Sequence, residues 1–430
     1  MRKSLILTAL ILAGALLALP AAVTTVPDKA SPTGYTTTFT YTDSEATNAR
    51  LVGSFTFYKD NDLRVFANGA ILNKTDKVAN YVSGPESWSP DGSMRHINDE
   101  GYTVEMAKDG DTFTYAMQLP CASYLYFFQV SYDNGESWSR VTDPDNLPPQ
   151  NSYSMNAQYR SQFFVPYDAS KQDASDDWTF LLPVEDSSKA GTIEYLEYTG
   201  ADGSARPAQV YLPAGYDAER EEPYKAVFMS HGGGGAEGDW FHQGNVNNIA
   251  DRLIADGVIE PFIIVAPENV TFTIKSGTDY HAIYDDMVNY LFPALEEKYN
   301  ITTDPEDRAM VGLSRGANVT SWILLRETAT FGSYALLSCG GVNLYSADSY
   351  NEYLGSVDIY LGGGFSDQAF LRANTLDLNK VSSVMGFAWL MNNLGLEFNH
   401  GDPVKVVPGA HDWFIWPQLA LDYFSNYLWK

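Results

Sequence analysis

The 430-residue sequence is poor in cysteine, since only Cys121 and Cys339 are of this type. They lie far apart in the chain, and the patterns described below place them in different domains. Two such cysteines exclude a disulfide-based scaffold. We expect both to be buried free thiols, because an unpaired cysteine behaves as a small hydrophobic residue.

Basic side chains are also scarce. The 27 Lys and Arg residues are outnumbered by 54 Asp and Glu residues, which gives a formal net charge of −27. Nucleic acids and anionic membrane surfaces would repel such a protein, so we expect neither as a partner. A neutral polymer such as a polysaccharide carries no such penalty. Solubility alone is the simpler explanation of the charge.

Long apolar runs are confined to the start of the chain. Residues 5–19 are apolar, follow two basic residues and precede the small residues Ala21 and Ala22. This order is typical of a secretory signal peptide, here residues 1–22, and the run is short for a membrane span. We therefore expect a secreted, extracellular protein.

The rest of the chain changes its pattern twice. Residues 35–165 form short alternating segments, with a hairpin signal (Asp-Asn-Gly) at 133–135, and predict an all-β immunoglobulin-like sandwich. Residues 166–190 are rich in Asp, Ser and Lys and predict a linker. From 191 to 430, short apolar strands alternate with helices, one of them expected over 281–299. This alternation predicts a doubly wound, mostly parallel α/β sheet.

A Gly-x-Ser-x-Gly motif occupies residues 312–316, between a predicted strand and a predicted helix. In this context the motif is typical of a nucleophile elbow, with Ser314 as the nucleophile. The flanking glycines are needed because the turn is sharp and leaves no room for side chains. The motif alone arises often by chance, but its position between a strand and a helix favours the catalytic interpretation.

Upstream, His231 is followed by four glycines at 232–235, directly after another predicted strand. A flexible turn is one interpretation. The functional one is an oxyanion hole, in which backbone N–H groups of Gly232, Gly233 and Arg315 bind the oxygen of the substrate carbonyl. We expect His231 itself to be structural.

Three histidines are candidates for the general base, namely His281, His400 and His411. In α/β-hydrolases the chain order is nucleophile, acid, histidine. His281 precedes Ser314, and His400 lies before the last predicted strand. His411 lies just after that strand and is therefore the expected base.

The acid is expected after an intermediate strand. Asp367 ends the glycine-rich segment that follows the predicted strand at 357–361. The alternatives are Asp402, which precedes its strand, and Asp412, which is adjacent to His411 and would point away from it. Asp367 is therefore the expected acid of the triad.

These motifs together resemble the esterase-D-like superfamily and, within it, family 1 carbohydrate esterases, which include feruloyl and acetyl xylan esterases. The similarity covers residues 190–430. Besides the glycine loop and the elbow, it rests on Gly-Phe-Ser-Asp at 364–367 and Gly-Ala-His-Asp-Trp at 409–413. It implies an α/β-hydrolase domain that uses neither a metal nor an organic cofactor. One departure is Arg315, since the family usually has Met after the nucleophile.

The resemblance implies feruloyl esters on plant cell-wall xylan, such as feruloylated arabinoxylan, or a small ester as the substrate. An aromatic acyl pocket is expected from four residues near the catalytic loops, which could equally be packing residues: Trp240, Phe241, Phe365 and Trp413. The alternatives are an acetyl xylan esterase, a siderophore esterase and a carbohydrate-binding protein without activity.

Residues 35–165 resemble the sandwich modules of family 48 carbohydrate-binding type. The likeness rests on residues 51–57 and 124–132 and on Asp-Pro-Asp-Asn at 143–146. Trp88 and Trp138 are candidates for stacking on sugars. Packing inside the sandwich, or against the catalytic domain, is the alternative for both.

Overall fold

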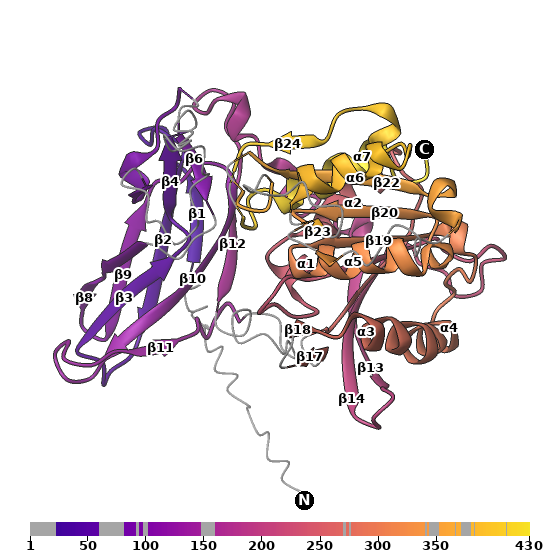
Figure 1. Ribbon diagram of the computed structural model, residues 1–430. Helices are drawn as coiled ribbons and strands as arrows, with labels where there is room; N and C mark the ends of the chain where they lie inside the picture. The colour runs from indigo at the N-terminus through magenta and orange to yellow at the C-terminus, as the bar shows by residue number, and fades with distance from the viewer. Residues whose placement is uncertain are drawn as a thin grey trace, which may run out of the picture.

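The computed structural model is drawn in Figure 1. It describes residues 23–59, 81–91, 94–97, 102–147, 160–269, 272–274, 277–339, 342–343, 352–365, 367–370, 380–381, 383–409 and 411–430. The predicted signal peptide therefore lies outside the described residues. Within them, no helix is both long enough and apolar enough to cross a membrane.

The first part of the chain, here called the β-rich part, is built from antiparallel strands. One sheet has the order β1 (Val23–Pro27), β2 (Tyr35–Thr42), β9 (Thr112–Met117) and β8 (Ala107–Asp109). A second has the order β11 (Ser139–Val141), β10 (Ala122–Ser131), β3 (Asn48–Gly53) and β7 (Tyr102–Glu105), with β12 (Ser161–Val165) also paired to β10. A third comprises β5 (Tyr81–Ser83), β4 (Thr56–Lys59) and β6 (Met94–Ile97). Strand β1 precedes residue 35, where the sandwich is expected to start, and pairs with β2.

The β-rich part has an aromatic core that is shared by its sheets. Phe39 of β2 meets Tyr126 of β10 and Phe163 of β12 edge to face, each with ring centroids 5.2 Å apart. The predicted hairpin is confirmed, because β10 and β11 pair across a turn in which Asn134 and Gly135 have positive φ angles of 61° and 90°.

The second part, here called the α/β part, is organised on an eight-stranded sheet. The strand order is β13 (Thr192–Thr199), β14 (Ala205–Leu212), β16 (Ile263–Pro267), β15 (Ala226–Ser230), β19 (Arg308–Leu313), β20 (Ser333–Leu337), β22 (Asp358–Gly364) and β24 (Lys405–Val407). Strand β14 runs antiparallel to its two neighbours, and the strands from β16 to β24 are mutually parallel. The sheet is thus mostly parallel, as the sequence predicts.

Two short antiparallel ribbons, β17 (Thr273–Ile274) with β18 (Gly277–Thr278) and β21 (Val342–Asn343) with β23 (Lys380–Val381), complete the strands. The helices are α1 (Asp239–His242), α2 (Val246–Ala255), α3 (Tyr280–Asp286), α4 (Phe292–Lys298), α5 (Arg315–Arg326), α6 (Val384–Asn393) and α7 (Trp416–Asn426).

Helices cover both faces of the eight-stranded sheet, which gives two separate cores. The side chains of β15 alternate between them, so that Phe228 joins the core under α3 to α6 and Val227 joins the core under α1, α2 and α7. Burial on both faces explains why these strands are continuous apolar runs in the sequence. The nucleophile elbow on such a sheet makes this part an α/β-hydrolase fold.

One predicted helix is interrupted. The segment expected as a helix over 281–299 consists of α3, a π-helical turn (Met287–Leu291) and α4. Pro293 lies in the first turn of α4 and has no backbone N–H to donate to the preceding turn. The wider turn before it accommodates this missing hydrogen bond.

The segment between the two parts is packed against both of them. Trp178 and Leu181 are buried in the core under α1, α2 and α7, together with Cys121 of the β-rich part. The side chain of Gln172 accepts from the backbone N–H of Cys121 at 2.8 Å. Both cysteines are free and buried, as expected. The segment and Cys121 of the β-rich part thus join the core under α1, α2 and α7, and β12 lies on the side that faces the sheet (Figure 1).

Candidate active site

Ser314 lies on a sharp turn between β19 and α5. Its backbone angles are φ 52° and ψ −115°, in a region that non-glycine residues rarely adopt. The turn is possible because Gly312 and Gly316 are in contact: a Cβ on Gly312 would lie 2.2 Å from the carbonyl oxygen of Gly316. This close approach is the physical reason why the motif requires glycine at both positions.

The structure brings Ser314, His411 and Asp367 together in one chain of hydrogen bonds. His411 Nε2 lies 2.8 Å from Ser314 Oγ, and His411 Nδ1 lies 2.8 Å from Asp367 Oδ1. Asp367 is fully buried, and the same Oδ1 accepts from the backbone N–H of Ala369. An ionised carboxylate only accepts, so Nδ1 carries the proton and Nε2 is left to accept from the serine hydroxyl. This is the arrangement of a nucleophile, a general base and an orienting acid.

Parallel strands explain why residues so distant in sequence meet. Ser314 follows β19, Asp367 follows β22, and His411 follows β24. The carboxyl ends of parallel strands lie on one edge of the sheet, where α/β folds place their sites. Strand β24 pairs with the end of β22, and the N–H of Phe365 donates to the carbonyl of Val407. The loops that carry the acid and the base are thus tied together.

The alternatives weighed from the sequence lie in other interactions. His281 is exposed and pairs with Asp285 on α3 at 2.8 Å. His400 Nε2 lies 3.6 Å from Asp358 Oδ1 at the start of β22. The carboxylates of Asp402 and Asp412 accept from the Tyr427 hydroxyl and from the backbone N–H of Phe414, respectively.

The glycine loop after β15 adjoins the elbow. A Cβ on Gly232 would lie 3.6 Å from the Cβ of Ser314, and one on Gly233 would lie 3.9 Å from the Cβ of Arg315. The N–H of Arg315 opens helix α5, where no carbonyl of the helix itself accepts it. The three residues expected to form the oxyanion hole therefore lie beside the nucleophile.

His231 is fully buried beneath this loop. Its Nδ1 lies 2.8 Å from the carbonyl oxygen of Gly232, and its Nε2 accepts from the backbone N–H of Asn269 at 3.2 Å. Since that N–H can only donate, Nδ1 carries the proton and donates to Gly232. Burial lowers the pKa of His231 to about 4, so the ring is neutral at pH 7. His231 is thus structural, as expected.

Two of the four aromatic residues expected to line an acyl pocket do not reach the surface. Trp240 is fully buried and Phe241 is 4% exposed, both in the core under α1, α2 and α7. They are packing residues, and the expectation that they contact substrate is corrected here. Phe365, which follows β22, is 44% exposed, and Trp413 is half-buried next to the same core.

Sequence reasoning missed the residues that end β16. Glu268 and Asn269 follow Pro267 at the catalytic edge of the sheet and are almost completely buried. The side chain of Asn269 donates to Ser230 Oγ at 2.7 Å, and its backbone carbonyl accepts from the Arg315 guanidinium at 2.8 Å. The available signal was a pair of polar residues directly after a buried strand.

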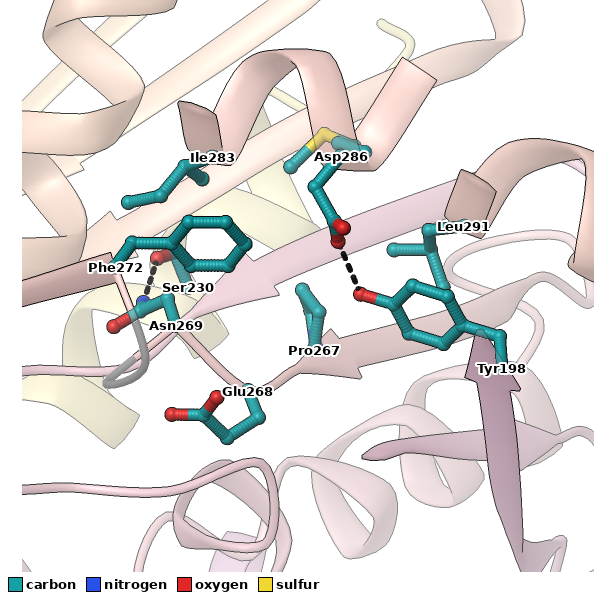
Figure 2. Close-up of a pocket in the computed structure, with 10 residues that line it drawn as sticks. Tyr198, Ser230, Pro267, Glu268, Asn269, Phe272, Ile283, Asp286 and Leu291 are labelled. Carbon is teal, nitrogen blue, oxygen red and sulfur yellow. Dashed lines mark hydrogen bonds between the residues drawn. The ribbon is translucent and has the colours of Figure 1, made fainter. Parts of the chain in front are cut away.

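These two residues line a small cavity with room for about one water molecule (Figure 2). Across the cavity, the hydroxyl of Tyr198 donates to Asp286 Oδ2 at 2.7 Å, and Arg206 Nε lies 3.1 Å from Asp286 Oδ1. Burial raises the pKa of Asp286 despite this pairing. The cavity is too small for an acyl group, and its lining contains none of the triad residues. Its lining includes Ser230, the residue directly before His231 and the glycine loop.

Proteins with similar sequences include two that are named as endo-1,4-beta-xylanases. An endo-1,4-beta-xylanase/feruloyl esterase of Xylanibacter ruminicola is 28% identical over 57% of this chain and 32% of its own length. Endo-1,4-beta-xylanase Y of Acetivibrio thermocellus is 30% identical over 34% of this chain and 14% of its own length. The chain therefore spans a third or less of these relatives.

Among solved structures, the enterobactin esterase FES of Shigella flexneri has a TM-score of 0.49 and 11% identity, over 90% of this chain and 92% of that one. The family model "Putative esterase" matches residues 200–421, which is more than half of the chain. The chain thus belongs to the Esterase family.

Proposed function

We propose that the chain hydrolyses carboxylic esters through an acyl-enzyme formed on Ser314. The observation that carries this assignment is the uninterrupted hydrogen-bond chain from Ser314 Oγ through His411 to Asp367, with both distances 2.8 Å. Each of the three groups can be given a distinct role in that chain, which a chance cluster of polar residues does not allow.

In the first half-reaction, His411 Nε2 removes the hydroxyl proton as Ser314 Oγ attacks the ester carbonyl carbon. The bond between that carbon and the alcohol oxygen then breaks, and His411 returns the proton to the leaving alcohol. Asp367 holds the imidazole in the required tautomer and stabilises its positive charge. Water repeats the sequence on the acyl-enzyme and releases the acid, which regenerates Ser314.

The negative oxygen of each tetrahedral intermediate needs donors that are already in place. We propose the backbone N–H groups of Arg315 and of the glycine loop, Gly232 and Gly233, for this role. Loss of one such donor typically lowers kcat about 10²–10³-fold. No step of this mechanism calls on a metal or an organic cofactor.

For the substrate, we propose hydroxycinnamoyl esters, in particular feruloyl groups on plant cell-wall xylan. Support comes from the Xylanibacter relative, whose name includes feruloyl esterase activity, and from Phe365 and Trp413 near the triad. An exposed aromatic ring two positions before Asp367 suits an acyl group that is itself a flat ring. Deacetylation of xylan is the second candidate, because an acetyl group needs no aromatic surface.

Hydrolysis of a siderophore ester has less support, because such an anionic substrate would meet a chain with a net charge of −27. A binding protein without activity is disfavoured by the complete Ser314, His411 and Asp367 set. An active-site serine probe of the fluorophosphonate type decides this point. We expect it to label the folded protein and not its Ser314→Ala variant.

The test of the substrate assignment compares methyl ferulate with p-nitrophenyl acetate, using residues 23–430 and the Ser314→Ala variant. Turnover of methyl ferulate that the variant lacks would support a feruloyl esterase. Turnover of the acetate alone would favour deacetylation. Turnover of neither ester by a folded, probe-reactive protein would contradict both assignments.

The roles of the outer parts of the chain are also proposals. We propose export through the signal peptide at residues 1–22, division at the 166–190 segment, and contact with polysaccharide through the β-rich part. Trp88 is not part of such a surface, because it is 8% exposed and its ring N–H donates to Asp176. Trp138 carries the guanidinium of Arg50 on its ring, 3.8 Å from the centroid.

A further inference from the structure

Asn269 lies between the two elements that supply the proposed oxyanion donors. Its N–H donates to His231, under the glycine loop, and its carbonyl accepts from the Arg315 side chain, on the elbow. Its own amide group donates to Ser230 Oγ, at the end of β15. One buried residue at the end of β16 thus contacts both sides of the candidate site.

The hydrogen bond from His231 to Gly232 fixes the direction of one peptide group. In a trans peptide the C=O and the following N–H point in opposite directions. The Gly232 carbonyl is turned inwards, toward the buried imidazole at 2.8 Å. The N–H of Gly233 is therefore turned outwards, on the side where Gly233 is exposed and adjoins Arg315.

The second contact fixes the elbow. Arg315 has a half-buried side chain, and its guanidinium donates to the Asn269 carbonyl at 2.8 Å instead of extending into solvent. Burial lowers the pKa of Arg315, and the negative charge of Glu268 opposes this shift. Figure 2 shows Glu268 and Asn269 next to each other, with the Asn269 amide nitrogen directed toward Ser230.

We propose that Arg315, Asn269 and His231 act as positioning residues that hold the Gly233 and Arg315 backbone N–H groups at a fixed separation. The inference rests on the proposed function and assigns a role to Arg315, which stands where the esterases that the sequence resembles usually have Met. The guanidinium does not touch the reacting atoms. It acts through Asn269, and the two donors then require no reorganisation when negative charge develops on the substrate oxygen.

The test replaces Arg315 by Met, which keeps the unbranched stem and removes the donor, and by Lys, which retains one. Arg326→Met, at the other end of α5, is the matched control. We expect Arg315→Met to lower kcat on p-nitrophenyl acetate roughly 10-fold, a fraction of the loss of a whole donor, with KM changed less than twofold. Arg315→Lys recovers part of the loss, and Arg326→Met retains wild-type kcat.

A second measurement separates positioning from general loosening of the fold. Phenylboronic acid forms a tetrahedral adduct with an active serine, and its inhibition constant reports the fit of the oxyanion hole. We expect this constant to rise in Arg315→Met by the same factor as kcat/KM falls. Glu268→Gln, which keeps the side-chain volume, gives a smaller change in the same direction. It also provides the test if Arg315→Met does not fold.

Wild-type kcat and an unchanged inhibition constant in folded Arg315→Met would overturn the positioning role. If only Glu268→Gln can be measured, wild-type kcat and an unchanged inhibition constant in that variant would overturn the positioning role as well. These outcomes leave the proposed ester hydrolysis intact. Failure of the proposed ester hydrolysis would look different, because the wild-type chain would then neither turn over p-nitrophenyl acetate nor bind the boronic acid.

Discussion

Trp240 and Trp413 meet edge to face, with ring centroids 5.3 Å apart. Trp240 belongs to α1, just after the glycine loop, and Trp413 follows His411 by two positions. The pair therefore joins the loop with the proposed oxyanion donors to the loop with the proposed base. Trp413 also meets Trp416 at 5.1 Å, and Trp416 meets the His411 ring at 5.3 Å. Aromatic packing behind the site holds the two loops at a fixed separation.

Asp367→Asn is expected to lower kcat about 10⁴-fold with little change in KM. An amide at this position can donate to Nδ1, which then keeps no proton, so Nε2 becomes the protonated atom and can no longer accept from Ser314. The measurement is turnover of p-nitrophenyl acetate. Asp358→Asn is the control, because Asp358 lies at the exposed start of β22, the strand that Asp367 follows. A kcat above one tenth of the wild-type value in Asp367→Asn would rule out this role for the carboxylate.

Gly312→Ala is expected to destabilise the fold by about 3 kcal/mol or more, because overpacking against backbone has no flexible side chain to absorb it. The added Cβ would lie 2.2 Å from the Gly316 carbonyl oxygen and 2.4 Å from Thr320 Oγ1. Denaturant unfolding gives the free energy of unfolding. Gly355→Ala serves as the control, since its Cβ would meet only Leu396 at 3.6 Å. Equal stability of the two variants would contradict the close contact at the elbow.

Features that are local in sequence could be predicted well. The Gly-x-Ser-x-Gly elbow, the parallel strands and the hairpin at 133–135 each depend on a few neighbouring residues. The order of nucleophile, acid and histidine along the chain then selected Asp367 and His411 among the candidate partners of Ser314. The broken helix also has a local cause, since Pro293 interrupts a pattern whose hydrophobic spacing remains helical.

Features that depend on contacts between distant segments could not be predicted. An aromatic residue beside a catalytic loop has the same sequence signature whether it faces a cleft or a core. Trp240 is buried in a core that also contains residues of α7 and of the 166–190 segment, and neither is its neighbour in sequence. The role of Asn269 similarly depends on partners 38 and 46 positions away.

Gln162→Ala is expected to destabilise the protein by about 1–3 kcal/mol, the usual cost of unpaired buried polar groups. Gln162 lies on β12 of the β-rich part, and its side-chain amide donates to the carbonyl of His242 and to Asn245 Oδ1 in the α/β part. His242 ends α1, so a looser contact also affects the glycine loop that precedes this helix. We therefore expect a severalfold lower kcat as well.

The matched control for Gln162 is Gln129→Ala, a half-buried glutamine on strand β10 of the same β-rich part. Thermal unfolding and p-nitrophenyl acetate turnover are measured for both variants. If the two variants behave alike in both measurements, the β-rich part does not support the catalytic loops through Gln162.

Acid stability is expected to depend on His242, the buried histidine at the end of α1. Its Nε2–H donates to the carbonyl of Arg160 at 2.8 Å, and burial lowers its pKa to about 4. A lowered pKa means that the unfolded chain binds the proton first. This contribution to stability is therefore complete above about pH 6.5 and is lost as the pH falls toward 4, by about 1.4 kcal/mol per pH unit.

The measurement compares the wild-type protein with His242→Gln, whose amide can still donate to Arg160. Asp239 stabilises the fold as the pH falls, because burial raises its pKa to about 6. His231 loses stability over the same range as His242, because its pKa is also lowered. Both residues are present in the two proteins, so their contributions cancel in the difference. Between pH 6.5 and 4.5 we expect the wild type to lose roughly 2 kcal/mol more free energy of unfolding than the variant. His281→Gln, at an exposed histidine, should follow the wild type throughout. Parallel curves for wild type and His242→Gln would mean that His242 titrates alike in the folded and unfolded chains.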